Sequence, residues 1–122
     1  MTEFVNLTPH RVVLVRETVP STVPELKPED IVRVFEPSGT VARLRVERQP
    51  LKVVENVPIV KMTRGALEPD VPRKPDTYYL VSAPVCDAVK REDFLAPDTS
   101  PEGVVRNPAG QVLGVKALVS CK

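Results

Sequence analysis

The chain has 122 residues and a mass of 13.5 kDa, which is the size of one domain, so a multi-domain enzyme is excluded. Its 17 Lys and Arg residues almost balance 16 Asp and Glu residues, which argues against a dedicated duplex DNA-binding protein, because such proteins carry excess positive charge. The composition includes 23 valines and 14 prolines, and both residue types favour short strands over long helices.

The first third of the chain predicts three short strands and one proline-rich segment. Residues 4–6 and 11–16 are strand-like and are joined by a link that contains a proline. Residues 17–30 carry three prolines at a spacing of four, and we interpret this segment as an exposed, polyproline-like loop or insert. Residues 31–35 form the third predicted strand.

The middle of the chain begins with the clearest alternating pattern. Residues 40–47 place Ala, Leu and Val on one face and two arginines on the other, which predicts a half-buried strand. Two further short strands are predicted at 51–54 and 58–61. Residues 63–75 contain three prolines and a glycine, and we interpret them as a loop.

The last third predicts a buried strand at 77–81, followed by the only helix. Ser82 is the expected N-cap, Asp87 is expected to favour the N-terminal end, and the helix is expected to extend over 83–92. Strands are then predicted around 104–106 and over 112–119. The whole chain, 1–122, is therefore predicted to be a single α+β, mainly β domain, with an antiparallel sheet of short strands and one short helix near residues 82–92.

The expected location follows from the cysteines and from the hydropathy pattern. No apolar stretch approaches the length of about 20 residues that spans a bilayer, so no membrane partner is expected. The N-terminal segment does not have the pattern of a secretory signal. Cys86 and Cys121 lack CxxC spacing, and we expect two reduced thiols and a cytoplasmic protein. Scarce Asn, Gln, Cys and Met beside abundant Arg, Glu and Pro are typical of a thermophilic source.

The residues offer little for catalysis. A single histidine, His10, excludes His clusters and HExxH zinc sites, and no phosphate-binding loop of the Walker type is present. A carboxylate pair drawn from the acidic residues at 87–98 suits acid–base chemistry, but caps and turns explain such residues better. We therefore predict no catalytic residue, no metal and no cofactor.

The arginines are the strongest candidates for binding. Arg43 and Arg45 project from one predicted strand, and Arg106 lies at the end of another, with Arg64 and Arg73 in predicted loops. Guanidinium groups bind phosphates bidentately and stack on flat rings, so these residues predict a site for an anion. From the residues alone, a solvated sheet face with surface ion pairs is the better explanation.

Six sequence blocks resemble a family of small proteins encoded by bacteriophages and prophages. They are NLTPH, PSGTVARL, VPIVKMTRGALE, TYYLVSAPVCDAV, DFLAPDT and VVRNPAGQVLGVKAL, and they cover most of the chain outside the proline-rich segment. The pattern is similar to the phage anti-Thoeris sponge proteins, which hold cyclic ADP-ribose isomers without cleaving them. One departure is Gly65, which follows Arg64 where the family usually has an aromatic residue.

The resemblance implies a nucleotide pocket and its residues. An aromatic residue and an arginine would enclose an adenine, and polar groups would bind the pyrophosphate. Carried over by position, these residues are Phe94, Asp98, Arg106 and Asn107, with Arg43 as a phosphate partner. The function so implied is sequestration of a cyclic nucleotide immune signal, either a cyclic ADP-ribose isomer or a cyclic oligonucleotide, without catalysis.

Two other functions remain open from the sequence. The first alternative is a virion structural or assembly protein, such as a head-decoration or head-completion subunit, because a strand-rich domain with free edges suits contact with a neighbour. The second is a small hydrolase or transferase that uses Asp93 or Asp98. Free strand edges also predict self-association as a homodimer or a higher even-numbered oligomer.

Overall fold

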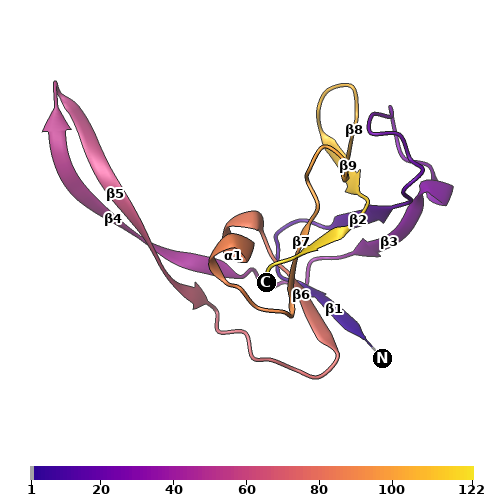
Figure 1. Ribbon diagram of the computed structural model, residues 1–122, viewed down its shortest axis with the longest axis horizontal. Coiled ribbons are helices and arrows are strands. Elements are labelled where there is room, and N and C mark those ends of the chain that lie inside the picture. Colours follow the sequence, from indigo (N-terminus) through magenta and orange to yellow (C-terminus); the bar gives the residue numbers. More distant parts are fainter. Residues whose placement is uncertain (1) are drawn as a thin grey trace.

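The computed structural model describes residues 2–122. Over these residues the chain forms ten strands, one short α-helix and one 3₁₀ turn. In chain order they are β1 (Glu3–Asn6), β2 (Val12–Val15), η1 (Pro28–Asp30), β3 (Ile31–Phe35), β4 (Arg43–Val54), β5 (Val57–Glu68), β6 (Thr77–Leu80), α1 (Ala83–Ala88), β7 (Phe94–Pro97), β8 (Val104–Arg106), β9 (Val112–Val115) and β10 (Leu118–Ser120). The α+β, mainly β class is therefore confirmed (Figure 1).

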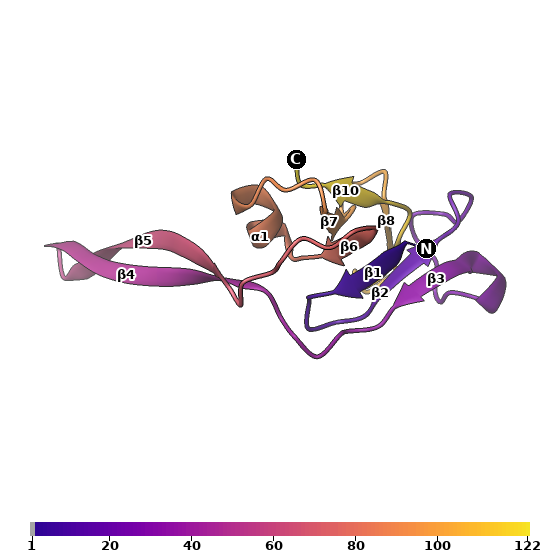
Figure 2. The same cartoon turned by 90° about the horizontal axis from the view of Figure 1, so that it is seen from below.

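Two four-stranded sheets form the body, and a two-stranded hairpin projects from it (Figures 1 and 2). The strand orders are β1-β6-β7-β10 and β3-β2-β9-β8. Both sheets are mixed, because β1 with β6, β6 with β7 and β2 with β9 are parallel pairs. Parallel neighbours need a crossover connection. Long connections of this kind separate β1 from β6, and the sequence pattern did not predict these pairings.

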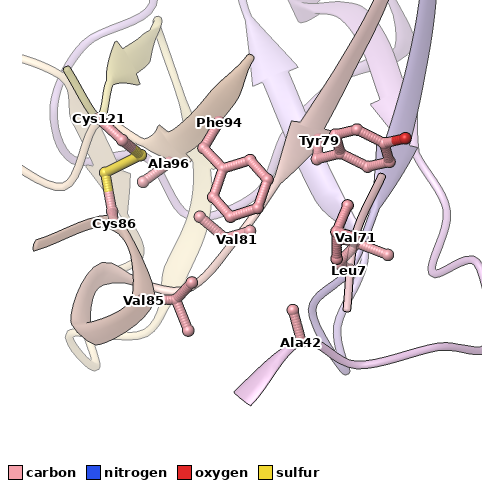
Figure 3. Packing of buried hydrophobic residues seen from close by; sticks show 10 residues of the cluster. All are labelled: Leu7, Ala42, Val71, Tyr79, Val81, Val85, Cys86, Phe94, Ala96 and Cys121. Carbon is pink, nitrogen blue, oxygen red and sulfur yellow. A yellow bond between two sulfur atoms is a disulfide. The ribbon is translucent and has the colours of Figure 1, made fainter. Parts of the chain in front are cut away.

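The main core lies between the first sheet and α1. Phe94 and Val81 are fully buried, Val85 of α1 is almost so, and the ring of Tyr79 meets that of Phe94 edge to face at 5.9 Å (Figure 3). The hydroxyl of Tyr79 donates to the carbonyl of Pro72 at 2.9 Å, so its polar end is satisfied at the margin of the core. This cluster holds together the strands that surround the candidate site.

The helix is shorter than the sequence predicted, since α1 ends at Ala88 instead of continuing to residue 92. Val89 is already extended, with φ −111° and ψ 104°, and the chain then turns to bring Phe94 into the sheet. Ser82 occupies the N-cap position as expected, but its side chain makes no capping hydrogen bond. Asp87 lies outside the first turn, so it does not favour the helix N-terminus as we expected.

The prediction of two reduced thiols was wrong. Cys86 in α1 and Cys121 after β10 form a disulfide, with a Cα–Cα distance of 4.9 Å, and both residues are buried (Figure 3). Spacing along the sequence did not predict this pair, because 35 residues separate two cysteines that only the fold brings together. The bond ties the C-terminus to the helix, and it removes the premise from which a cytoplasmic location was deduced. No helix among residues 2–122 is long and apolar enough to cross a membrane.

The hairpin replaces three predicted strands and part of a predicted loop. β4 and β5 are each 12 residues long and pair antiparallel from Arg43 opposite Glu68 to Val54 opposite Val57. The pairing shifts register between Leu44 and Val46 and again between Pro50 and Lys52. Each shift interrupts the period-two alternation, which is why the sequence suggested separate short strands. At the tip, Glu55 and Asn56 both have positive φ, as a tight two-residue turn requires.

Two other segments differ from their predictions. The segment 17–30 is not a free polyproline loop, because it contains the buried Val19 and its Val23 N–H donates to the carbonyl of Arg106 at 3.0 Å. The strand predicted over 112–119 is divided into β9 and β10, which belong to different sheets. The strand predicted at 31–35 is confirmed as β3.

Candidate functional site

The NLTPH block forms a buried hydrogen-bond hub around Asn6. The amide nitrogen of Asn6 donates to the carbonyls of His10 and Phe35, both at 2.9 Å. Its side-chain oxygen accepts from the backbone N–H of Thr8 at 2.9 Å, and the hydroxyl of Thr8 lies 2.7 Å from the same oxygen. Asn6 is only 2% exposed, so the block that carries the family resemblance has a structural role in this chain.

The same block fixes where the hairpin leaves the body. The carbonyl of Asn6 accepts from both the backbone N–H and the hydroxyl of Ser38, at 3.0 Å and 2.8 Å. The carbonyl of Leu7 accepts from the N–H of Ala42 at 3.0 Å, one residue before β4 begins. Because backbone bonds of this kind leave little freedom, the base of the hairpin is held against the loop between β1 and β2.

A cavity of about 350 Å³ lies at this base. Its walls come from the β1–β2 loop, the start of α1 and the first residues of the hairpin: Leu7, Thr8, Pro9, Val41, Ala42, Arg43, Leu44, Val46, Arg64, Ser82, Pro84 and Val85. The lining is mainly apolar, with two guanidinium groups, Arg43 and Arg64, at its margin. Among residues 2–122, neither arginine has an acidic group within ion-pair distance.

A second cavity, of about 420 Å³, lies on the other side of the NLTPH loop. It is lined mostly by apolar residues of β2 and β9, with His10 and Arg11 at its polar side. Arg11 is already near Glu36, at 3.8 Å, and both side chains are exposed. Of the two cavities, the one at the hairpin base therefore has the arginines without an acidic partner among residues 2–122.

The residues predicted for the nucleotide site do not come together as one pocket. Of the five, only Arg43 lines the cavity at the hairpin base. Phe94 is fully buried in the core, and the guanidinium carbon of Arg91 lies 4.3 Å from its ring centre. The assignment of Phe94 as the stacking partner of a base is corrected for this reason, because no face of its ring is free.

The other three predicted residues make hydrogen bonds within their own loops. A side-chain oxygen of Asp98 accepts from the N–H of Ser100 at 3.1 Å, and hydrogen bonds from Ser100 lower the pKa of this carboxyl. The guanidinium of Arg106 donates to the carbonyl of Gly110 at 2.8 Å. Asn107 exchanges side-chain hydrogen bonds with Gln111 across the same turn. None of the three lines either cavity described above.

A partly buried ion pair accounts for Asp93, one of the two candidate catalytic carboxylates. Arg91 donates to both carboxylate oxygens, at 2.9 Å and 2.6 Å, and also to the carbonyl of Val71. Although partial burial opposes ionisation, these hydrogen bonds and the charge of Arg91 hold the pKa of Asp93 below its ordinary value. Asp93 is thus engaged in tying the β6–β7 region to the segment before β6. Arg91 was not singled out in the sequence, although its spacing of two from Asp93 and three from Phe94 was visible there.

Comparisons with protein-family models, with curated proteins and with solved structures found no match. The resemblance to phage sponge proteins therefore remains a prediction from sequence blocks.

We predict that Asn6→Ala lowers the free energy of unfolding by about 2–4 kcal/mol, because the buried carbonyls of His10 and Phe35 and the N–H of Thr8 lose their partners. Urea denaturation measures this change. The matched control is Asn107→Ala, whose hydrogen bonds are exposed and whose cost should stay below about 1 kcal/mol. Equal costs for the two variants would show that the Asn6 hub is not a structural requirement.

Proposed function

We propose that this protein acts by association, as a subunit of a homo-oligomeric assembly whose neighbours are held by the β4–β5 hairpin. We call residues 43–68 the arm. The phage setting of this proposal rests on the sequence resemblance, and the choice of assembly over sequestration rests on the shape and surface of the arm. The observation that carries it is an apolar strand face that packs against the body only at its base, through Leu44 and Leu67, and is exposed at Val46, Val53 and Met62.

The register of the arm sorts its side chains onto two unlike faces. Cross-strand partners project to the same side of a sheet, so the pairs 44/67, 48/62, 50/60 and 53/58 share one face with the pair 46/64. We call this the apolar face; apart from Arg48 and Arg64, its members are Leu44, Val46, Pro50, Val53, Pro58, Val60, Met62 and Leu67. The middle of the opposite face carries Glu47, Gln49, Lys61 and Thr63.

The apolar face is exposed over its middle and outer part. Val46 is 51% exposed, Val53 67% and Met62 57%. Contiguous exposed apolar surface of this kind typically marks an interface. A two-stranded hairpin on its own is also only marginally stable in water, so an arm that projects beyond the body gains most from a partner (Figure 2).

The dimensions of the arm set the size of the interface that its apolar face can form. Strands of 12 residues at about 3.3 Å per residue are about 40 Å long, and two strands are about 10 Å wide. One face thus offers roughly 400 Å², and covering it with an equal surface removes roughly 800 Å² from water. Two arms laid face to face therefore remove roughly 800 Å² in total, which is below the size of a standard specific interface, so contacts at the arm bases have to add to it.

We predict an even-numbered oligomer, with a dimer as the smallest unit, in light scattering coupled to size exclusion at micromolar concentration. Met62→Lys, in the middle of the apolar face, should shift this species to monomer, because the interface would then bury a second positive charge beside Arg48, the cross-strand partner of Met62. Gln49→Lys adds the same charge to the opposite face, one residue along the strand from Arg48, and should leave the mass unchanged. A monomeric parent chain, or equal effects of the two substitutions, would contradict the proposal.

Small-ligand sequestration is a second candidate, and the cavity at the arm base favours it. Two guanidinium groups beside an apolar wall suit a molecule with a flat ring and phosphates. In this second candidate function, the ligand is a cyclic ADP-ribose isomer or a cyclic oligonucleotide, and the protein holds it without turnover.

Calorimetry with those nucleotides tests the second candidate. Arg43→Ala is expected to weaken binding by about tenfold or more, since it removes a charged hydrogen-bond donor. Arg106→Ala is the matched control, because Arg106 does not line this cavity, and it should bind like the parent chain. Absence of heat with every nucleotide would remove this candidate, and recovery of altered nucleotide would show catalysis instead of sequestration.

A further inference from the structure

We propose that the cavity at the arm base receives the tip of the arm of a second copy, with the carboxylate of Glu55 meeting Arg43 and Arg64. The inference rests on the proposed function and adds to it the identity and register of the contact. Three observations lead to it: the continuity of one apolar surface, the symmetry of the arm and the distribution of unpaired charge.

The apolar face of the arm continues into the cavity at its base. Leu44, Val46 and Arg64 belong to that face by register, and the same three residues line the cavity. The surface that extends along the arm therefore ends in a hollow whose far wall is formed by Pro9, Pro84 and Val85. A partner that covers the face along its full length therefore places its own end in this hollow.

A second copy is the partner that fits the length of the face. A two-fold axis through the middle of the arm, near Arg48 and Met62, lays two arms face to face in opposite directions. The tip of each arm then lies over the base of the other, and the two contacts are identical. Arg48 is exposed and long enough to extend to the edge of the ribbon, away from its symmetry mate.

The tip of the arm carries a negative charge, which the lining of the cavity lacks. Glu55 stands at the turn, close in sequence to the exposed Val53, Val54 and Val57, so one negative charge lies at an apolar end of the arm. Among residues 2–122, Glu55 has no basic group within ion-pair distance. The cavity has the complementary composition, with two unpaired arginines and an apolar wall. Docking thus pairs charges that are unpaired in a single chain and buries apolar groups at both ends.

The distribution of charge over the whole arm also favours tip-to-base docking. It holds six of the 17 Lys and Arg residues but only three of the 16 Asp and Glu residues. Two arms that met tip to tip would bring like ends together, whereas tip-to-base docking places the acidic turn against the basic base. Electrostatic complementarity of this kind selects one register among several apolar ones.

A charge exchange tests the contact. Glu55→Arg and Arg64→Glu should each weaken dimerisation by about tenfold or more, measured by sedimentation equilibrium, because each places like charges together at both symmetric contacts. The double variant Glu55→Arg/Arg64→Glu restores one pair of opposite charges at each contact while Arg43 stays unchanged, so it should dimerise at least about threefold more tightly than either single variant.

Matched controls stand on the opposite face of the arm. Glu47→Arg and Lys61→Glu make the same changes of charge on exposed side chains that the docking leaves outside, and they should change the dissociation constant by less than about threefold. Circular dichroism of every variant should show unchanged strand content, because all four positions are exposed.

The outcomes separate this inference from the proposal on which it rests. A monomeric parent chain overturns both. A dimer that Met62→Lys disrupts, but in which Glu55→Arg and Arg64→Glu act like the controls, overturns only the tip-to-base contact. A double variant as weak as the single variants also overturns it, because the two charges then do not meet. Restoration in the double variant, with silent controls, supports it.

Discussion

The carboxamide of Asn6 is the interaction on which the arrangement of this molecule depends. Its nitrogen and oxygen satisfy backbone groups of His10, Phe35 and Thr8 in a place that water does not reach. A buried amide binds all of its partners or destabilises the fold, so the loop between β1 and β2 has one conformation. That loop in turn accepts backbone hydrogen bonds from Ser38 and Ala42. The direction in which the arm leaves the body, and the cavity at its base, follow from this chain of bonds.

The body and the arm are stabilised by different means. The body has a packed core, a disulfide from α1 to the C-terminal segment and the partly buried Arg91–Asp93 pair. Along most of its length the arm has only its own ladder of hydrogen bonds and one exposed apolar face. The body is therefore stabilised as a domain, whereas the arm exposes apolar side chains to water. The proposed association through the arm would give the apolar side chains of this projecting ribbon a role, which a function confined to the body would not.

The local patterns of the sequence predicted much of the fold but little of the site. The fold class, the strand at 31–35 and the start of the helix at Ala83 follow from β-branched runs and a proline in the first helical turn. The 12-residue arm strands did not, because two register shifts break their alternation. The Cys86–Cys121 bond and the parallel pairs depend on long-range geometry, which no local pattern contains. Phe94 was placed in a ligand site by position within a block, whereas the packing of Tyr79 and Arg91 around it makes it core.

Hydrogen exchange at two protein concentrations tests most directly whether the arm is an interface. If neighbours cover the arm, amides of β4 and β5 should exchange more slowly above the dissociation constant than below it, because an isolated hairpin opens readily. Amides of β6 and β7, in the core of the body, should exchange at the same rate at both concentrations. Arm amides whose exchange does not change with concentration would contradict the account.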